Sequence, residues 1–97
     1  MLGAQLTPAE VRAIALAGRV HAHPDYHARQ HHVTWEDCVY SLANCHRVQA
    51  DLRARHAGTN SYVAFGRITR LQVLRVDFRL DAAPDGSTIL VVTAIPY

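Results

Sequence analysis

The chain has 97 residues and a formal net charge of +2 at pH 7, and 49% of its residues are hydrophobic. This length suits a single domain, residues 1–97, which can bury one core without disulfides or metal ions. No apolar run is long enough to cross a membrane, and the first residues do not resemble a secretory leader. We therefore expect a soluble cytoplasmic protein with no membrane contact.

All ten basic residues are arginines, and the chain also has seven histidines. Arginine offers a planar, permanently charged group that suits phosphate or carboxylate, whereas histidine changes its charge near neutral pH. Cys38 and Cys45 match neither a disulfide framework nor a zinc-binding spacing. The composition favours anionic partners, although the small net charge does not establish a nucleic-acid partner by itself.

Two or three helices are predicted in the first half of the chain. Thr7 can cap a helix over residues 8–17, and Glu10 stands where it would complete a capping box. Thr34 can cap a later helix over residues 35–44, which begins with acidic residues that complement the helix dipole. These two helices rest on local signals alone.

A further short helix is predicted from His23 to Gln30 or His32, because a proline and an aspartate follow His23 in the first turn. In a helix, His23, His27 and His31 would line one face, since each is four residues from the next. Histidines at this spacing can ligate zinc, but the remaining cysteines, histidines and aspartates offer no standard ligand set. We expect no metal ion and no cofactor.

The same three histidines are candidate catalytic residues. One imidazole could remove the proton of a ribose 2′-hydroxyl while another protonates the leaving 5′-oxygen, which is the chemistry of metal-independent RNA cleavage. The alternative is that His23, His27 and His31 are ordinary surface or half-buried residues. The sequence leaves both interpretations open.

Four strands are predicted after the helices. Residues 45–55 alternate between apolar and polar positions, as in a half-buried strand. Residues 62–68 and 74–80 are further strands, and residues 87–95 form a nearly continuous apolar run that favours an interior strand. Because the strands follow one another, we predict an α+β fold with a four-stranded antiparallel sheet and helices on one face.

Arginines recur along the first three predicted strands. They could gather into one patch that binds phosphate and stabilises a pentacovalent transition state, with Tyr62 stacking on an unpaired base and Thr93 donating a hydrogen bond. The alternative is a solvated sheet face on which Arg75, Asp77 and Arg79 pair across strands. The arginines on these strands are Arg47, Arg53, Arg55, Arg67, Arg75 and Arg79. Of these, Arg47, Arg67 and Arg75 are the candidates for binding phosphate.

The stretch from His23 to Val39, together with the order of helices and strands, resembles a family of small bacterial domains of uncharacterised function. The family signature is a His-Ala-Arg-x-Arg-Met helix, an Arg-Gly-Val-Thr segment and an acidic helix start. In an alternative register, His27-Ala28-Arg29 matches the signature, and Arg29 is included among the phosphate-binding candidates. The matching segments are His23, His31-His32-Val33-Thr34, Glu36-Asp37 and the terminal strand Val91-Val92-Thr93-Ala94.

This family is similar in architecture to the RelE, barnase, EndoU and colicin group of metal-independent ribonucleases, many of which are toxins. The resemblance implies a concave sheet that carries arginines, with histidines at its edge. It also implies RNA as substrate and an antitoxin or immunity-type protein as partner. Our leading hypothesis is therefore a toxin-like endoribonuclease that cleaves single-stranded RNA.

Two other hypotheses remain. The arginine-rich face could bind RNA or an acidic protein without catalysis. Alternatively, the chain could be a structural subunit that forms a homodimer through an exposed strand, because unpaired strand edges favour such pairing.

Overall fold

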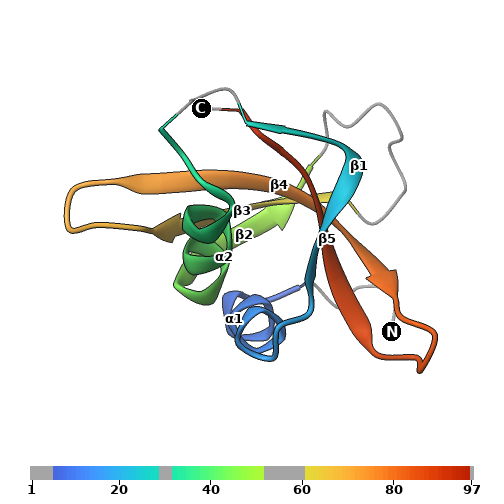
Figure 1. Cartoon of the computed structure of the whole chain (residues 1–97). Helices are drawn as coiled ribbons and strands as arrows, with labels where there is room; N and C mark the ends of the chain where they lie inside the picture. The colour runs from blue at the N-terminus through green and yellow to red at the C-terminus, as the bar shows by residue number, and fades with distance from the viewer. Residues whose placement is uncertain (1–5, 29–31, 52–60, 97) are drawn as a thin grey trace.

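The computed structural model describes residues 6–28, 32–51 and 61–96, which form two helices and a five-stranded sheet (Figure 1). The strand order in the sheet is β1-β5-β4-β3-β2. Strands β2 to β5 therefore form an antiparallel meander, and β1 lies beside the last strand. The elements in chain order are α1 (Pro8–Leu16), β1 (Val20–Ala28), α2 (Trp35–Ala43), β2 (Cys45–Ala50), β3 (Ser61–Arg67), β4 (Val73–Ala82) and β5 (Thr88–Ile95).

The α+β class is confirmed, but the predicted four-stranded antiparallel sheet is wrong. The segment expected to form a helix from His23 is instead part of β1, a fifth strand that pairs in parallel with β5. The four-residue spacing of the histidines resembled a helical face. Pro24 has no N–H to donate to a neighbouring strand, and it stands in the irregular part of β1, where the register with β5 shifts. The sheet is consequently mixed.

Both described helices begin where the sequence predicts. The Thr7 hydroxyl accepts a hydrogen bond from the Glu10 N–H (3.2 Å), and the Glu10 carboxylate accepts one from the Thr7 N–H (2.9 Å). Thr34 and Asp37 form the same reciprocal capping box at α2. Among the described residues, no helix is long and apolar enough to span a membrane.

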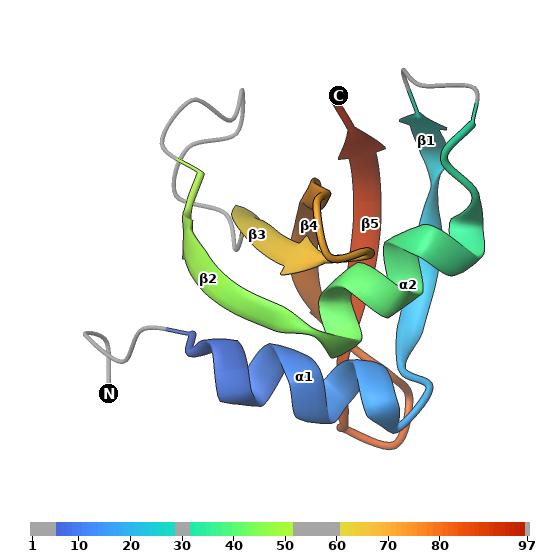
Figure 2. The same cartoon turned by 90° about the vertical axis from the view of Figure 1, so that its left-hand side faces the viewer.

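The core lies between the helices and one face of the sheet. Figure 2 shows α1 and α2 on the same side of the strands. Val11 of α1 and Leu42 of α2 are fully buried, and Phe78 and Leu90 meet them from the sheet in the same cluster. β5 lies between β1 and β4, so the prediction of an interior strand is confirmed.

The sheet face opposite the helices is called the open face below. On β4, the side chains of Val76 and Phe78 belong to the core, so Arg75, Asp77 and Arg79 point to the open face. The predicted strand over residues 45–55 is described only to Asp51, and Arg53 and Arg55 lie outside the described residues. The open face carries the polar groups that sequence patterning assigned to the exposed side of the strands.

Candidate active site

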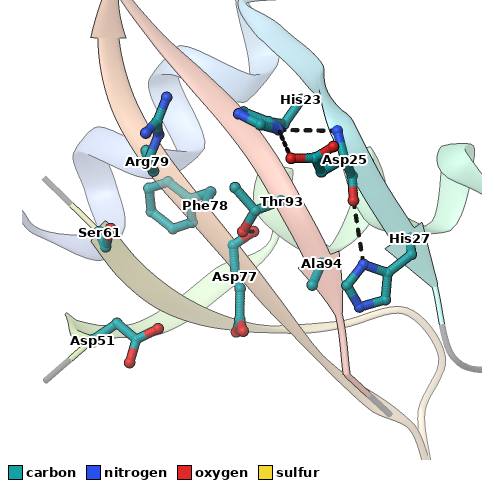
Figure 3. A pocket seen from close by; sticks show the side chains of 10 residues that line it. All are labelled: His23, Asp25, His27, Asp51, Ser61, Asp77, Phe78, Arg79, Thr93 and Ala94. Atoms are coloured by element: carbon teal, nitrogen blue, oxygen red, sulfur yellow. Dashed lines mark hydrogen bonds and ion pairs between the residues drawn. The ribbon is translucent and has the colours of Figure 1, made fainter. Parts of the chain in front are cut away.

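A pocket of about 360 Å³ lies on the open face and crosses most of the sheet. Figure 3 shows side chains from opposite edges of the sheet turned toward this hollow. Strands distant in sequence therefore supply its polar groups. The lining residues are His23, Asp25 and His27 of β1, Thr93 and Ala94 of β5, Asp77, Phe78 and Arg79 of β4, Ser61 of β3, and Asp51, which follows β2.

Both histidines of the pocket belong to β1, where the pairing with β5 is irregular. Ala22 pairs with Val92 and His27 pairs with Ala94, so the residues between them on β1 face Thr93 alone. His23, Asp25 and His27 are two residues apart in turn, so the pleat of a strand sends their side chains to the same face. His23 and His27 can thus line the same pocket although neither belongs to a helix.

The main chain of Asp25 selects a different ring tautomer for each histidine. The Asp25 N–H donates to Nδ1 of His23 (3.0 Å), so in the neutral ring Nδ1 has the lone pair and Nε2 carries the proton. Nδ1 of His27 lies 3.3 Å from the Asp25 carbonyl oxygen. A carbonyl oxygen can only accept, so this Nδ1 carries the proton and Nε2 of neutral His27 has the lone pair.

The Asp25 carboxylate offers a second partner to His23. Its Oδ2 atom lies 3.9 Å from Nδ1 of His23, and it attracts the imidazolium once that ring is protonated. The dashed lines in Figure 3 mark these contacts around Asp25. His23 therefore presents Nε2–H in both protonation states, whereas neutral His27 presents a proton acceptor at Nε2.

Asp77 is the half-buried carboxyl group of the pocket, with 19% of its side chain exposed. Burial raises its pKa above the ordinary aspartate value; Arg75 and His27 act in the opposite direction, and the negative charge of Asp51 adds to the rise. Arg75 Nε donates to the Asp77 carboxylate at 2.9 Å. The Thr93 hydroxyl donates to the Asp77 carbonyl oxygen at 3.2 Å, which ties β5 to β4 beneath the pocket.

Arg79 brings a positive charge to the same pocket. It stands opposite Ser61 on β3 and Val91 on β5. Unlike Arg75, it forms no ion pair with any described residue. Its guanidinium is therefore available to an anionic ligand in the pocket.

The predicted site residues fall into three groups. His23, His27 and Thr93 lie together in the pocket. Arg47, Arg67 and Arg75 belong to neighbouring strands of the sheet, but they do not line the pocket. Tyr62 stacks on Phe78, with ring centroids 5.8 Å apart; Phe78 belongs to the core cluster, and partly buried Tyr62 packs against that cluster. Arg29 and His31 lie outside the described residues.

Three acidic residues of the pocket were missed as site residues. Asp25 and Asp51 have no distinguishing sequence context. Asp77 takes one of the polar positions that alternate with apolar residues over 74–80, so its sequence context does not distinguish it either. Among residues 6–28, 32–51 and 61–96, no three histidine, cysteine or acidic side chains are arranged to hold a metal ion.

Comparisons of the chain with models of protein families, with curated proteins and with solved structures found no match.

Proposed function

We propose that this chain is an endoribonuclease that cleaves single-stranded RNA by acid–base chemistry without a metal ion. The observation that carries the proposal is the pair of opposite tautomers around Asp25. A base and a proton donor are both needed to move one proton from the ribose 2′-hydroxyl and deliver another to the leaving 5′-oxygen. His27 and His23 supply these complementary groups in one pocket.

In the proposed reaction, Nε2 of His27 removes the 2′-hydroxyl proton as the 2′-oxygen forms a bond to phosphorus. The bond between phosphorus and the 5′-oxygen breaks, and protonated His23 gives its Nε2 proton to that oxygen. The products are a 2′,3′-cyclic phosphate and a 5′-hydroxyl. His27 ends the step protonated, and His23 ends it neutral with its remaining proton on Nδ1, facing the Asp25 N–H. Proton exchange with water then returns a proton to Nε2 of His23 and removes one from His27.

Neighbouring groups support the charges in this reaction. Arg79 stabilises the negative charge that grows on the phosphoryl oxygens. The Asp25 carboxylate lies 3.9 Å from Nδ1 of His23, where it can pair with the imidazolium, and the Asp25 carbonyl accepts from His27 throughout the step. Single-stranded RNA suits the site because an unpaired backbone can turn its 2′-hydroxyl toward the phosphate, and DNA lacks that hydroxyl.

The test is cleavage of a labelled mixed-sequence RNA in the presence of a chelator. His27→Ala and His23→Ala are each expected to slow cleavage by about 100-fold or more, because each removes one proton-transfer group. His46→Ala is the matched control, since His46 is an exposed histidine of β2 outside the pocket. The same RNA with 2′-deoxyribose throughout should stay intact.

Equal cleavage by all four proteins would identify a contaminating nuclease and refute the assignment. Absence of cleavage by the unmodified protein would refute it as well. In that case a binding module would be the better description, a reading favoured by the arginines that lie away from the pocket.

A further inference from the structure

The end of the open face away from the pocket is formed by the β3–β4 hairpin and the adjoining part of β2. Figure 1 shows this hairpin extending beyond the helices. No acidic residue occurs between Ser61 and Val76. We refer to its positive and apolar side chains as the arginine surface, which comprises Arg47, Phe65, Arg67, Arg70 and Leu71.

Pairing across the strands joins the arginine surface to the rest of the open face. Phe65 pairs with Arg47 on one side and with Arg75 on the other. The guanidinium carbon of Arg47 lies 5.6 Å from the centroid of the Phe65 ring. A guanidinium and an aromatic ring in this arrangement offer a flat cationic platform, on which an unpaired base can stack.

The turn of the hairpin is held by its own hydrogen bonds. Arg67 Nη1 donates to the Arg70 carbonyl oxygen at 2.8 Å, and the Ile68 N–H donates to the Gln72 carbonyl oxygen at 3.0 Å. Leu71 is 97% exposed at the tip. A large apolar side chain that an ordered turn holds in water has an unfavourable hydration free energy, which contact with a partner would relieve.

The charges favour a polyanion as that partner. Arg47, Arg67 and Arg70 form no ion pair within the described part of the chain. Phosphates bind such guanidinium groups, while Leu71 and the Phe65 platform can contact the faces of unpaired bases. The path to the pocket is short, since Val73 and Asp77 on β4 are separated by about 13 Å of extended strand.

We propose that the arginine surface binds the single-stranded RNA that flanks the cleaved phosphate. This inference rests on the proposed function, because it treats the pocket and the hairpin as successive sites for one RNA strand. Arg67 and Arg70 contact phosphates, and the Arg47–Phe65 platform and Leu71 contact bases. A dinucleotide reaches only the pocket, whereas a longer strand occupies both sites.

Binding is tested with an RNA of about ten nucleotides, a length that spans several base-sized sites. His27→Ala protein is used as the parent so that the RNA is not consumed. Adding Arg67→Gln or Arg70→Gln is expected to make the plot of log affinity against log salt concentration less steep, by about 0.7 in slope for each lost phosphate contact. Adding Arg19→Gln removes the same charge near β1 and should leave that slope unchanged.

Cleavage separates this inference from the proposed function. With His27 intact, Arg67→Gln and Arg70→Gln should raise KM for long RNA and leave the cleavage rate of a dinucleotide unchanged. If the histidine variants abolish cleavage but the arginine variants bind and cleave long RNA normally, the arginine surface is not an RNA site and the pocket assignment stands. If RNA binds through Arg67 and Arg70 but no RNA is cleaved, the pocket assignment fails and the binding site stands.

A lipid surface is the competing source of phosphate. Vesicles of phosphatidylcholine with phosphatidylserine provide the comparison, with Leu71→Ser as the variant. Vesicle binding that depends on Leu71, without RNA binding by the same protein, would overturn the proposal. Salt-sensitive RNA binding that is weakened by Leu71→Ser, with no retention on vesicles, supports it.

Discussion

Asp77 is an acidic side chain largely withdrawn from water, since 19% of it is exposed at the base of the candidate pocket. Its ion pair with Arg75 does not offset burial, and the pKa of Asp77 is raised overall. An ionised carboxylate in this position is thus less favourable than one in the unfolded chain. Asp77 costs stability whenever it is charged, which is the kind of cost that functional sites commonly carry.

This cost predicts a particular pH dependence. Because the folded-state pKa of Asp77 lies above its unfolded value, its stabilising contribution is full below the ordinary aspartate pKa and is lost as pH rises through the raised value. Asp77→Asn keeps the group neutral. The variant should therefore gain free energy of unfolding relative to the unmodified protein as pH rises from acid to neutral.

Urea unfolding of both proteins at several pH values measures this difference. Asp81→Asn serves as the control, because Asp81 is an exposed carboxylate on the same strand. A difference between Asp77→Asn and the unmodified protein that stays constant with pH would contradict the expectation.

Between elements, α2 and the sheet approach each other closely at Gly66 of β3. The buried Ser41 hydroxyl of α2 lies within hydrogen-bonding distance of the carbonyl oxygens of Gly66 (3.3 Å) and Leu74 (3.2 Å). A Cβ atom at residue 66 would overlap the Ser41 main chain. Only glycine allows α2 to rest this close to β3, and the packing is dense on both sides.

Gly66→Ala is therefore expected to lower the free energy of unfolding by about 3 kcal/mol, because main-chain atoms of α2 must move to admit the methyl group. Gly86→Ala is the comparison, since residue 86 has open space around it and a positive φ of 86°. That change should cost only about 1 kcal/mol of backbone strain. Equal losses in the two variants would show that the contact with Ser41 does not limit the packing.

Elements with local signals could be predicted from the sequence. Thr7 and Thr34 act through residues three positions away, and the alternation in β2 reflects a regular antiparallel neighbour. β1 also carried a local signal, because apolar and polar residues alternate from Val20 to Ala28. The predicted helix relied instead on the four-residue spacing of the histidines, and the parallel partner β5 is distant in sequence. Residues four positions apart share one face in a strand as well as in a helix, so the histidine spacing did not distinguish the two structures.

The residues of the candidate site also differ in whether they could be predicted from the sequence. His23, His27 and Thr93 could be selected by residue type alone, because each carries chemistry that is easy to name. Asp77 could not, since its importance comes from burial and from the approach of β1, β4 and β5, which no local pattern encodes. Long-range pairing therefore determines the site more than composition does.

Across the whole molecule, both cysteines lie within the one core. Cys38 and Cys45 are each 0% exposed. Burial raises the pKa of Cys38 to about 12 and also raises the pKa of Cys45. Since the thiolate is the reactive form, neither residue should react with a thiol reagent while the protein is folded.

Thiol labelling at neutral pH is accordingly expected to report opening of the core. The labelling rate in native buffer should be about a thousandfold lower than in denaturing urea, in keeping with a folded state of ordinary stability. Ala9→Cys adds an exposed thiol on α1 as a positive control. Rapid modification of Cys38 or Cys45 in native buffer would mean that the core opens locally.

The parallel pairing of β1 with β5 also affects how the chain can fold during its synthesis on the ribosome. The histidine-bearing strand is synthesised early, but the neighbour that positions it is the last described strand to emerge. Until residues 88–95 have left the exit tunnel, β1 has no partner in the sheet and His27 has no fixed position beside Asp77. A nascent chain would thus lack the assembled pocket until β5 had been synthesised, and the proposed activity would arise only after that point.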